Sequence, residues 1–169
     1  MLAVEFIDPQ SGPDLGNGAA TAAWLRARGI RGELDLEDLT ALARLGAAVE
    51  ALLRSRAGGE PPADIAIEYV NACSAGAAVA PQLNWPPNGR PRMWLSSGGG
   101  AGSHVLGTVA RSAIDLLAGD SDRLRVCEAH GCERIFLSAS ARRRWCSDAC
   151  GNRVRVARHA ARRRTSSTG

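Results

Sequence analysis

The sequence has no lysine, few aromatic residues and no long apolar run. All 21 of its Lys or Arg positions are arginine, which a biased codon supply is enough to explain, so we attach no function to the choice. No segment reaches the roughly 18 consecutive apolar residues of a membrane span. The first ten residues carry Glu5 and Asp8 without a basic region, which is not typical of a signal peptide. We therefore expect a cytoplasmic protein that does not bind membranes.

The remaining composition is that of a globular protein with one domain and a small addition. The chain has 169 residues, of which 45% are hydrophobic and 22% are charged. Because much of the apolar content is alanine, we expect a core built mainly from helices. We predict a helical domain over residues 1–119, a small module over 120–164 and a disordered tail over 165–169.

Apolar periodicity predicts four helices in the first domain, over residues 19–28, 35–56, 63–80 and 103–117. The clearest is 35–56, where leucine and valine recur every three or four residues. Three acidic residues lie in its first turn, where negative charge interacts favourably with the helix dipole. Residues 82–85 and 92–96 flank the turn residues PPNGR and predict a β-hairpin. SGGGAG then predicts a flexible connection. Residues 1–16 are compatible with a strand or with one helical turn.

Four of the five cysteines lie within 24 residues of one another. Cys127 and Cys132 are separated by four residues, and Cys146 and Cys150 by three, with thirteen residues between the pairs. Close pairs in a chain without an export signal favour zinc, which prefers four soft ligands in a tetrahedron. The first pair would lie on a hairpin turn, where Gly131 allows positive φ. The second would lie at a helix start. Together they predict a treble-clef-like finger.

Four cysteine ligands leave no open position on the metal, so we expect one structural Zn²⁺ rather than a catalytic one. Two disulfides or unrelated buried thiols are the alternative. His130 is expected to be an exposed turn residue, and Cys73 a buried small residue. Because the module has little core of its own, loss of zinc is expected to melt residues 123–160.

Charge is concentrated at the C-terminal end. Residues 1–120 hold 9 arginines and 13 acidic residues, a net charge of −4, whereas residues 121–169 hold 12 arginines and 4 acidic residues, a net charge of +8. A basic end on an acidic body indicates a polyanionic partner. In the expected last helix, Arg155, Arg158 and Arg162 share a narrow arc. The predicted nucleic-acid contacts are Arg142, Arg143, Arg144, Asn152, Arg153, Arg155, Arg158, His159, Arg162 and Arg163.

Several interpretations of this helix stay open. It could bind DNA along phosphates or in the major groove, bind RNA, bind an acidic protein surface, or be a solvated tail. Val154, Ala157 and Ala161 form an apolar strip that we expect to pack on the hairpin turn. Trp145 is expected to cover the zinc site rather than to stack on bases.

The segment RRWCSDACGNRVRVARH resembles the CGNR zinc-finger family of bacterial proteins, named for the tetrapeptide Cys150-Gly151-Asn152-Arg153. Arg144 to Ser147 and the Ile135-Phe136 pair are similar to that family as well. The resemblance implies that its four zinc ligands are Cys127, Cys132, Cys146 and Cys150. Residues 2–118, with VEFID and the Trp24-Leu25 pair, resemble the ABATE domain of stress-induced transcription regulators. The resemblance therefore implies DNA binding and transcription regulation.

The first domain offers no catalytic set, and we expect no enzyme activity. A domain of this size could enclose a small-molecule pocket, and our hypothesis is that the hairpin residues Trp85 and Trp94 line it. The effector is unknown. A small DNA-binding module commonly needs two half-sites, so we also expect a homodimer formed through this domain, on a surface that the sequence does not identify.

Overall fold

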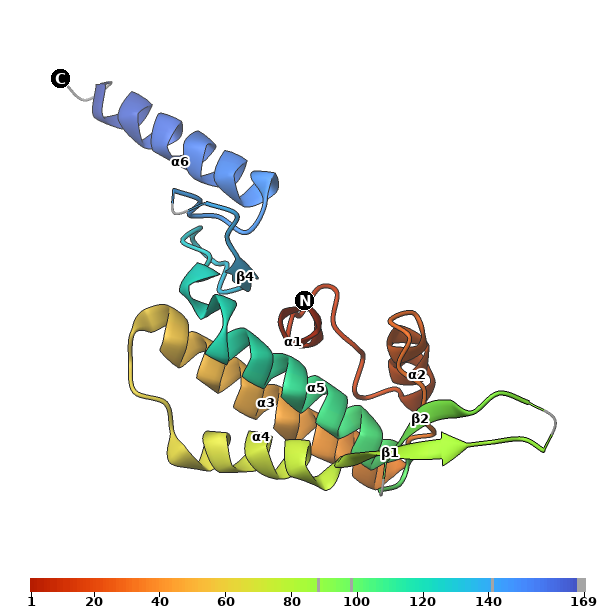
Figure 1. Ribbon diagram of the computed structural model, residues 1–169. Helices are drawn as coiled ribbons and strands as arrows, with labels where there is room; N and C mark the ends of the chain where they lie inside the picture. The colour runs from red at the N-terminus through yellow and green to blue at the C-terminus, as the bar shows by residue number, and fades with distance from the viewer. Residues whose placement is uncertain (88, 98, 141, 167–169) are drawn as a thin grey trace.

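Three long helices form the body of the protein (Figure 1). They are α3 (Leu36–Gly58), α4 (Asp64–Gly76) and α5 (Ala101–Ala118), and each contacts the other two. This computed structural model describes residues 1–87, 89–97, 99–140 and 142–166. The mainly helical fold with short antiparallel hairpins is as predicted from the sequence.

Helix α3 begins where the sequence places an acidic N-cap. The Asp35 carboxylate accepts a hydrogen bond from the Asp38 backbone N–H at 2.8 Å, and the Asp38 carboxylate accepts one from the Asp35 N–H. This reciprocal pair satisfies N–H groups that have no partner inside the helix. The buried face of α3 consists of Leu42, Leu45, Val49, Leu52 and Leu53. The predicted 35–56 helix is therefore present, extended by two residues at its end.

The N-terminal segment is helical rather than a strand. Helix α1 (Leu2–Phe6) packs on α5 and buries Ala3 and Phe6. Helix α2 (Gly18–Arg26) starts at Asn17, whose side chain accepts a hydrogen bond from Ala20 N–H. The Phe6 and Trp24 rings meet edge to face with centroids 5.9 Å apart. The two short helices are thereby joined to the body through apolar contacts.

A two-stranded hairpin extends from one end of the body (Figure 1). Strands β1 (Val79–Asn84) and β2 (Arg92–Ser97) pair antiparallel. We predicted that α4 would end at residue 80, but it ends at Gly76 because β1 already starts at Val79. Helix α5 likewise begins at Ala101, inside the expected flexible connection.

The hairpin does not support the predicted tryptophan pocket at Trp85. That side chain is 66% exposed, and the described cavities of the body are lined by other residues. The physical reason is that Trp85 follows β1 on an arm that leaves the body, so no second layer encloses it. The side chain of Trp94 lies outside the described part of the structure.

The opposite end of the body carries the cysteine-rich module. A 3-10 turn, η1 (Asp120–Arg123), leads from α5 into β3 (Leu124–Val126), which pairs with β4 (Ile135–Leu137). Helix α6 (Asp148–Ser166) follows and projects away from the body (Figure 1). The helix therefore runs into the predicted 165–169 tail, of which residues 167–169 lie outside the described part of the chain.

The β3–β4 hairpin has two buried faces. Leu124, Val126, Ile135 and Leu137 pack with the core of the body, and Leu124 and Ile135 are only 1% and 7% exposed. Phe136, on the other face, packs with the cysteines instead. This alternation is the ordinary period of a strand. Helix α5 ends at Ala118, but the core of the body continues past it into the β3–β4 hairpin of the module.

No helix in the described ranges is long and apolar enough to cross a membrane.

The α3 core position Leu45 provides a test of this packing. Leu45→Ala is expected to lower the free energy of unfolding by about 3 kcal/mol, because it removes a fully buried side chain and leaves a cavity. Leu36→Ala on the same helix, where the side chain is 80% exposed, is the matched control and should change it by less than about 0.5 kcal/mol. Urea denaturation followed by circular dichroism measures both. Equal effects would contradict the assigned buried face.

Candidate metal centre

The first cysteine pair lies on a tight turn between β3 and β4. The Cys127 N–H donates to the Arg134 carbonyl at 2.9 Å and so closes the hairpin, while the Cys132 N–H donates to Ala129 at 2.9 Å. Gly131 has a φ of 70°, which a residue with a side chain rarely adopts. The predicted glycine turn is therefore present. His130 is exposed there, as expected.

The second pair lies at the start of α6. The Ser147 hydroxyl accepts a hydrogen bond from the Cys150 N–H at 3.3 Å, and the Ser147 carbonyl accepts one from Gly151 N–H at 3.1 Å. These are the two bonds that an N-cap residue makes. The Cys146 N–H also points at the Cys127 sulfur, at 3.4 Å. The helix start thus brings the second pair onto the first.

The four sulfur atoms form one compact cluster. Those of Cys127, Cys132, Cys146 and Cys150 all lie within 4.8 Å of one another. Cys146 Sγ is 3.8 Å from Cys132 Sγ and 3.6 Å from Cys150 Sγ. A tetrahedral Zn²⁺ with bonds of about 2.3 Å would separate its sulfur ligands by about 3.8 Å. The spacing matches zinc and is far longer than the roughly 2 Å of a disulfide, so the disulfide alternative is wrong.

Electrostatics inside the cluster also favour a cation. Burial alone would raise the pKa of the Cys132 thiol, but hydrogen bonds from the backbone and side chain of Arg134 outweigh it and lower that pKa to about 6. The Ser147 hydroxyl lowers the pKa of Cys150. Burial and the neighbouring sulfurs raise the pKa of Cys146 to about 12. Cys132 and Cys150 therefore favour the thiolate form, whereas Cys146 loses its proton near neutral pH only beside a positive ion.

Two family models match the sequence, one over the helical body and one over the cysteine-rich module. The first is ABATE, "Putative stress-induced transcription regulator", over residues 2–120, and the second is the CGNR zinc finger over residues 123–163. The chain belongs to the ABATE family. Its C-terminal module is a CGNR zinc finger, and together with the sulfur geometry this identifies one structural zinc ion as its cofactor. No curated protein matches the sequence.

Apolar side chains surround the metal site of the CGNR finger. Phe136, Ala129 and Val154 pack with the cysteines, and so does Trp145, which has the covering position that the sequence predicted. Gly151 of the family's tetrapeptide lies against this indole: a Cβ there would be 3.0 Å from the Trp145 ring. A side chain at this position would have to displace the indole by a few tenths of an ångström, so the close approach of the helix to Trp145 favours glycine here.

Three of the predicted nucleic-acid contacts are engaged within the CGNR finger. Arg143 donates to the carbonyls of Trp145 and Cys146 at 3.0 and 2.7 Å, and its guanidinium lies over the Phe136 ring. Arg144 forms an ion pair with Glu128. The Arg153 guanidinium donates toward the Cys150 sulfur at 3.6 Å. These three arginines therefore have partners within the finger, which a charge count does not show.

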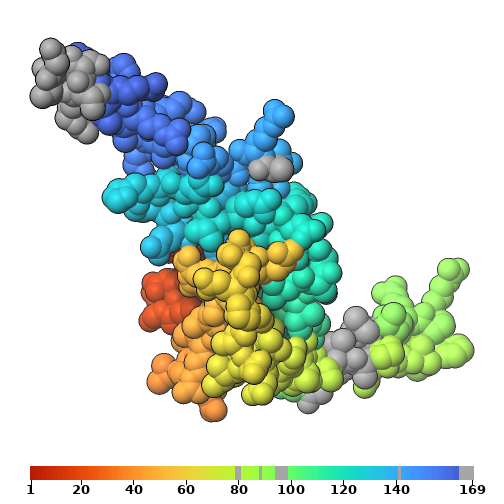
Figure 2. All heavy atoms as spheres, turned by 90° about the vertical axis from the view of Figure 1, so that its left-hand side faces the viewer, coloured from red at the N-terminus to blue at the C-terminus, as the bar shows by residue number. Residues whose placement is uncertain are grey.

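All ten predicted contacts, these three arginines included, are exposed, and most of them lie on the projecting helix α6 (Figure 2). Arg142 precedes the helix, and Asn152 lies in its first turns. The structure thus brings the predicted contacts onto one module. The seven predicted contacts besides Arg143, Arg144 and Arg153 are Arg142, Asn152, Arg155, Arg158, His159, Arg162 and Arg163.

The sequence did not indicate three residues that support the finger. Arg134 lies beside the cysteines and also donates to the Gln10 amide oxygen at 2.6 Å, joining the finger to the N-terminal segment. Glu128 and Ser147 supply the ion pair and the helix cap described above. Only Ser147 carries a sequence signal, because serine before an expected helix is typical of an N-cap.

Removing one ligand tests the zinc assignment. Cys132→Ser should release about one equivalent of zinc and open the finger, because three thiolates hold a structural zinc far more weakly. Since β3 and β4 share the core of the body, the loss of structure should be greatest over residues 138–160 and smallest in the two strands. From the sequence alone, we expected the whole of residues 123–160 to melt when zinc is lost, so the affected range is now shorter. Elemental analysis and hydrogen exchange measure the two effects.

Cys73→Ser is the control, because Cys73 lies on α4 outside the cluster. It should retain full zinc. Unchanged zinc content in Cys132→Ser would contradict the site.

Proposed function

We propose that this protein is a zinc-containing transcription regulator that binds DNA through the CGNR finger and helix α6. The observation that carries the proposal is a metal-anchored helix that leaves the body (Figure 2) and exposes Arg153, Arg155, Arg158, Arg162 and Arg163. The ABATE match supports a regulatory role for the protein as a whole.

The charge of α6 fits a polyanion. From residue 149 to residue 166 the sequence has six arginines and no acidic residue. Arg155, Arg158 and Arg162 are three or four residues apart, so they lie on one side of the helix. Neutralising several phosphates releases condensed counterions, which is the main source of affinity for duplex DNA. The helix thus presents a compact basic face of the kind that DNA binds.

The packing of α6 leaves that face accessible. Cys150 and Gly151 are buried and Val154 is half-buried, so the first two turns are anchored to the zinc site. Ala157 and Ala161 are exposed, and the expected apolar strip therefore packs only at Val154. The distal turns have no covering layer among the described residues. A helix held only at its N-terminal end can lie in a major groove, as recognition helices do.

The zinc has no catalytic part in this proposal. Four thiolate ligands complete a tetrahedron and leave no position for water or substrate. The metal instead sets the direction of α6, because Cys150 is both a ligand and part of the first turns of the helix. We therefore also propose that the protein is not an enzyme.

Charge reversal tests the proposal. The full chain is titrated with random duplex DNA over a range of salt concentrations. The triple variant Arg155→Glu, Arg158→Glu, Arg162→Glu should bind at least about a hundredfold more weakly, because three phosphate contacts become repulsive. Its slope of log K against log salt should be shallower by about three. Zinc content should not change.

A variant with the same change in net charge separates position from charge. Arg26, Arg31 and Arg44 are exposed on the body, and their reversal to glutamate should preserve most of the binding. Equal loss in both triple variants would contradict α6 as the contact surface. Tighter binding of duplex RNA or of an acidic protein than of DNA would contradict DNA as the partner.

A further inference from the structure

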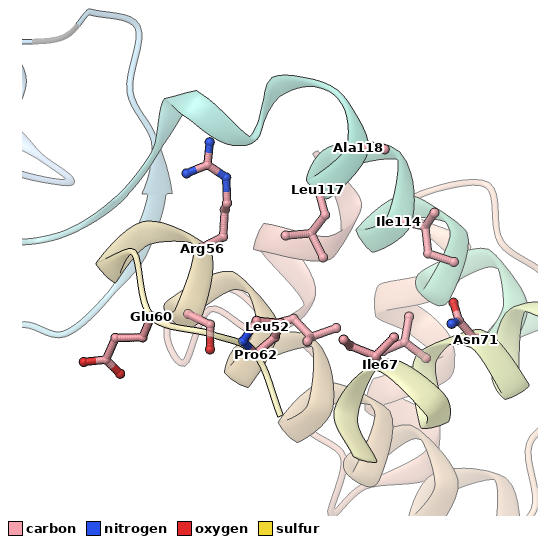
Figure 3. Close-up of a pocket in the computed structure, with 11 residues that line it drawn as sticks. Leu52, Arg56, Glu60, Pro62, Ile67, Asn71, Ile114, Leu117 and Ala118 are labelled. Atoms are coloured by element: carbon pink, nitrogen blue, oxygen red, sulfur yellow. The ribbon is translucent and has the colours of Figure 1, made fainter. Parts of the chain in front are cut away.

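A cavity in the body lies between the end of α3, the start of α4 and the end of α5 (Figure 3). Its volume is about 420 Å³, within the range of small-molecule sites, which is roughly 300–1,000 Å³. Leu117 and Ile67 point into it from opposite sides. Most of its wall is apolar, and the apolar lining residues are Leu52, Pro62, Ile67, Val70, Ile114, Leu117 and Ala118.

Arg56 is the cationic group of this cavity. Its guanidinium lies at the end of the cavity nearest to η1, whereas the Glu60 carboxylate points away (Figure 3). The other polar lining residues, Ser55 and Asn71, are uncharged. An apolar cavity with one cationic end is complementary to a molecule with an apolar framework and one acidic group.

The present partners of Arg56 can be exchanged for such a group. Arg56 Nε donates to the Ser121 hydroxyl at 3.0 Å, and a second guanidinium nitrogen pairs with the Asp122 carboxylate. Asp122 is 90% exposed, so water is ready to solvate its carboxylate when the pair breaks. Exposed ion pairs of this kind contribute about 0–1 kcal/mol. An acid bound in the cavity competes with Asp122 at low cost.

We propose that this cavity binds a small amphipathic organic anion whose acidic group pairs with Arg56 in place of Asp122. The apolar part of the ligand lies between Leu117 and Ile67, and its removal from water supplies most of the affinity. This site lies away from the exposed hairpin, where the sequence led us to expect a pocket.

The position of Arg56 gives the ligand a route to the finger. Ser121 and Asp122 belong to η1, and η1 leads directly into β3, which packs on the body core and is followed at once by Cys127. Exchange at Arg56 alters the contacts of the segment that supports the zinc site. This regulatory consequence rests on the proposed function, whereas binding of the anion does not.

Two fluorescent probes with similar rings test the site. Anilinonaphthalene sulfonate is an amphipathic anion, and N-phenylnaphthylamine has the same aromatic framework without the acidic group. Both are titrated into the full chain with zinc bound. We expect one saturable site for the anion. Arg56→Gln should weaken the anion about tenfold and leave the neutral probe unchanged, because only the anion uses the guanidinium.

Removal of the competitor should act in the opposite direction. Asp122→Asn should tighten the anion several-fold, since the guanidinium no longer holds a carboxylate, and again leave the neutral probe unchanged. A merely structural role of Arg56 would weaken both probes together. Opposite effects of the two substitutions on the anion alone are therefore the signature of competition at Arg56.

A bulky side chain inside the cavity locates the site. Ile67→Trp should abolish binding of both probes, while Ile65→Trp, at a 77% exposed position of the same helix, should preserve it. Circular dichroism confirms folding of both. The proposal is overturned if Ile67→Trp binds like the unmodified chain, if Ile65→Trp loses binding equally, or if Arg56→Gln affects both probes alike. A dimer that Ile67→Trp dissociates would show a second copy in the cavity and would also overturn it.

Discussion

Four cysteine sulfur atoms that lie within 4.8 Å of one another share one zinc ion, and the C-terminal module depends on that ion. Two of the sulfurs come from the turn of a hairpin whose strands are three residues long, and the other two come from the start of a helix. Neither segment has an apolar core large enough to hold the other by burial alone. The metal supplies the missing free energy, and the hydrogen bonds of Arg134 and Ser147 prepare the thiols for it.

The hairpin transfers this constraint to the body. Its register pairs Leu124 with Leu137 and Val126 with Ile135, so four apolar side chains face the helices while Phe136 faces the cysteines. The ABATE domain and the CGNR finger thus pack against opposite faces of the same β3–β4 hairpin. Helix α3 contacts both η1 and β3, so packing is contiguous from the body to the hairpin that leads to the first cysteine pair.

Features that depend on neighbouring residues could be predicted from the sequence, whereas contacts between side chains of distant segments could not. The cysteine spacing, the Gly131 turn and the acidic start of α3 each depend on neighbours in the chain, and all three are confirmed. Arg144 looked like a free contact because its partner Glu128, sixteen residues earlier in the chain, becomes its neighbour only after folding. Trp85 looked like a pocket residue because aromatic residues are usually buried, but no layer covers its hairpin arm.

The charge on α6 works against the helix that carries it. Arg155, Arg158 and Arg162 are spaced so that like charges repel along one face, at about 0.2–0.5 kcal/mol per pair. The distal turns bury almost no apolar surface that could offset this repulsion, although positive charge near the C-terminus interacts favourably with the helix dipole. Phosphates placed along the face would remove the repulsion. Under the proposed function, a bound polyanion would therefore also stabilise the distal turns of α6, whereas the zinc site holds only the N-terminal end of the helix.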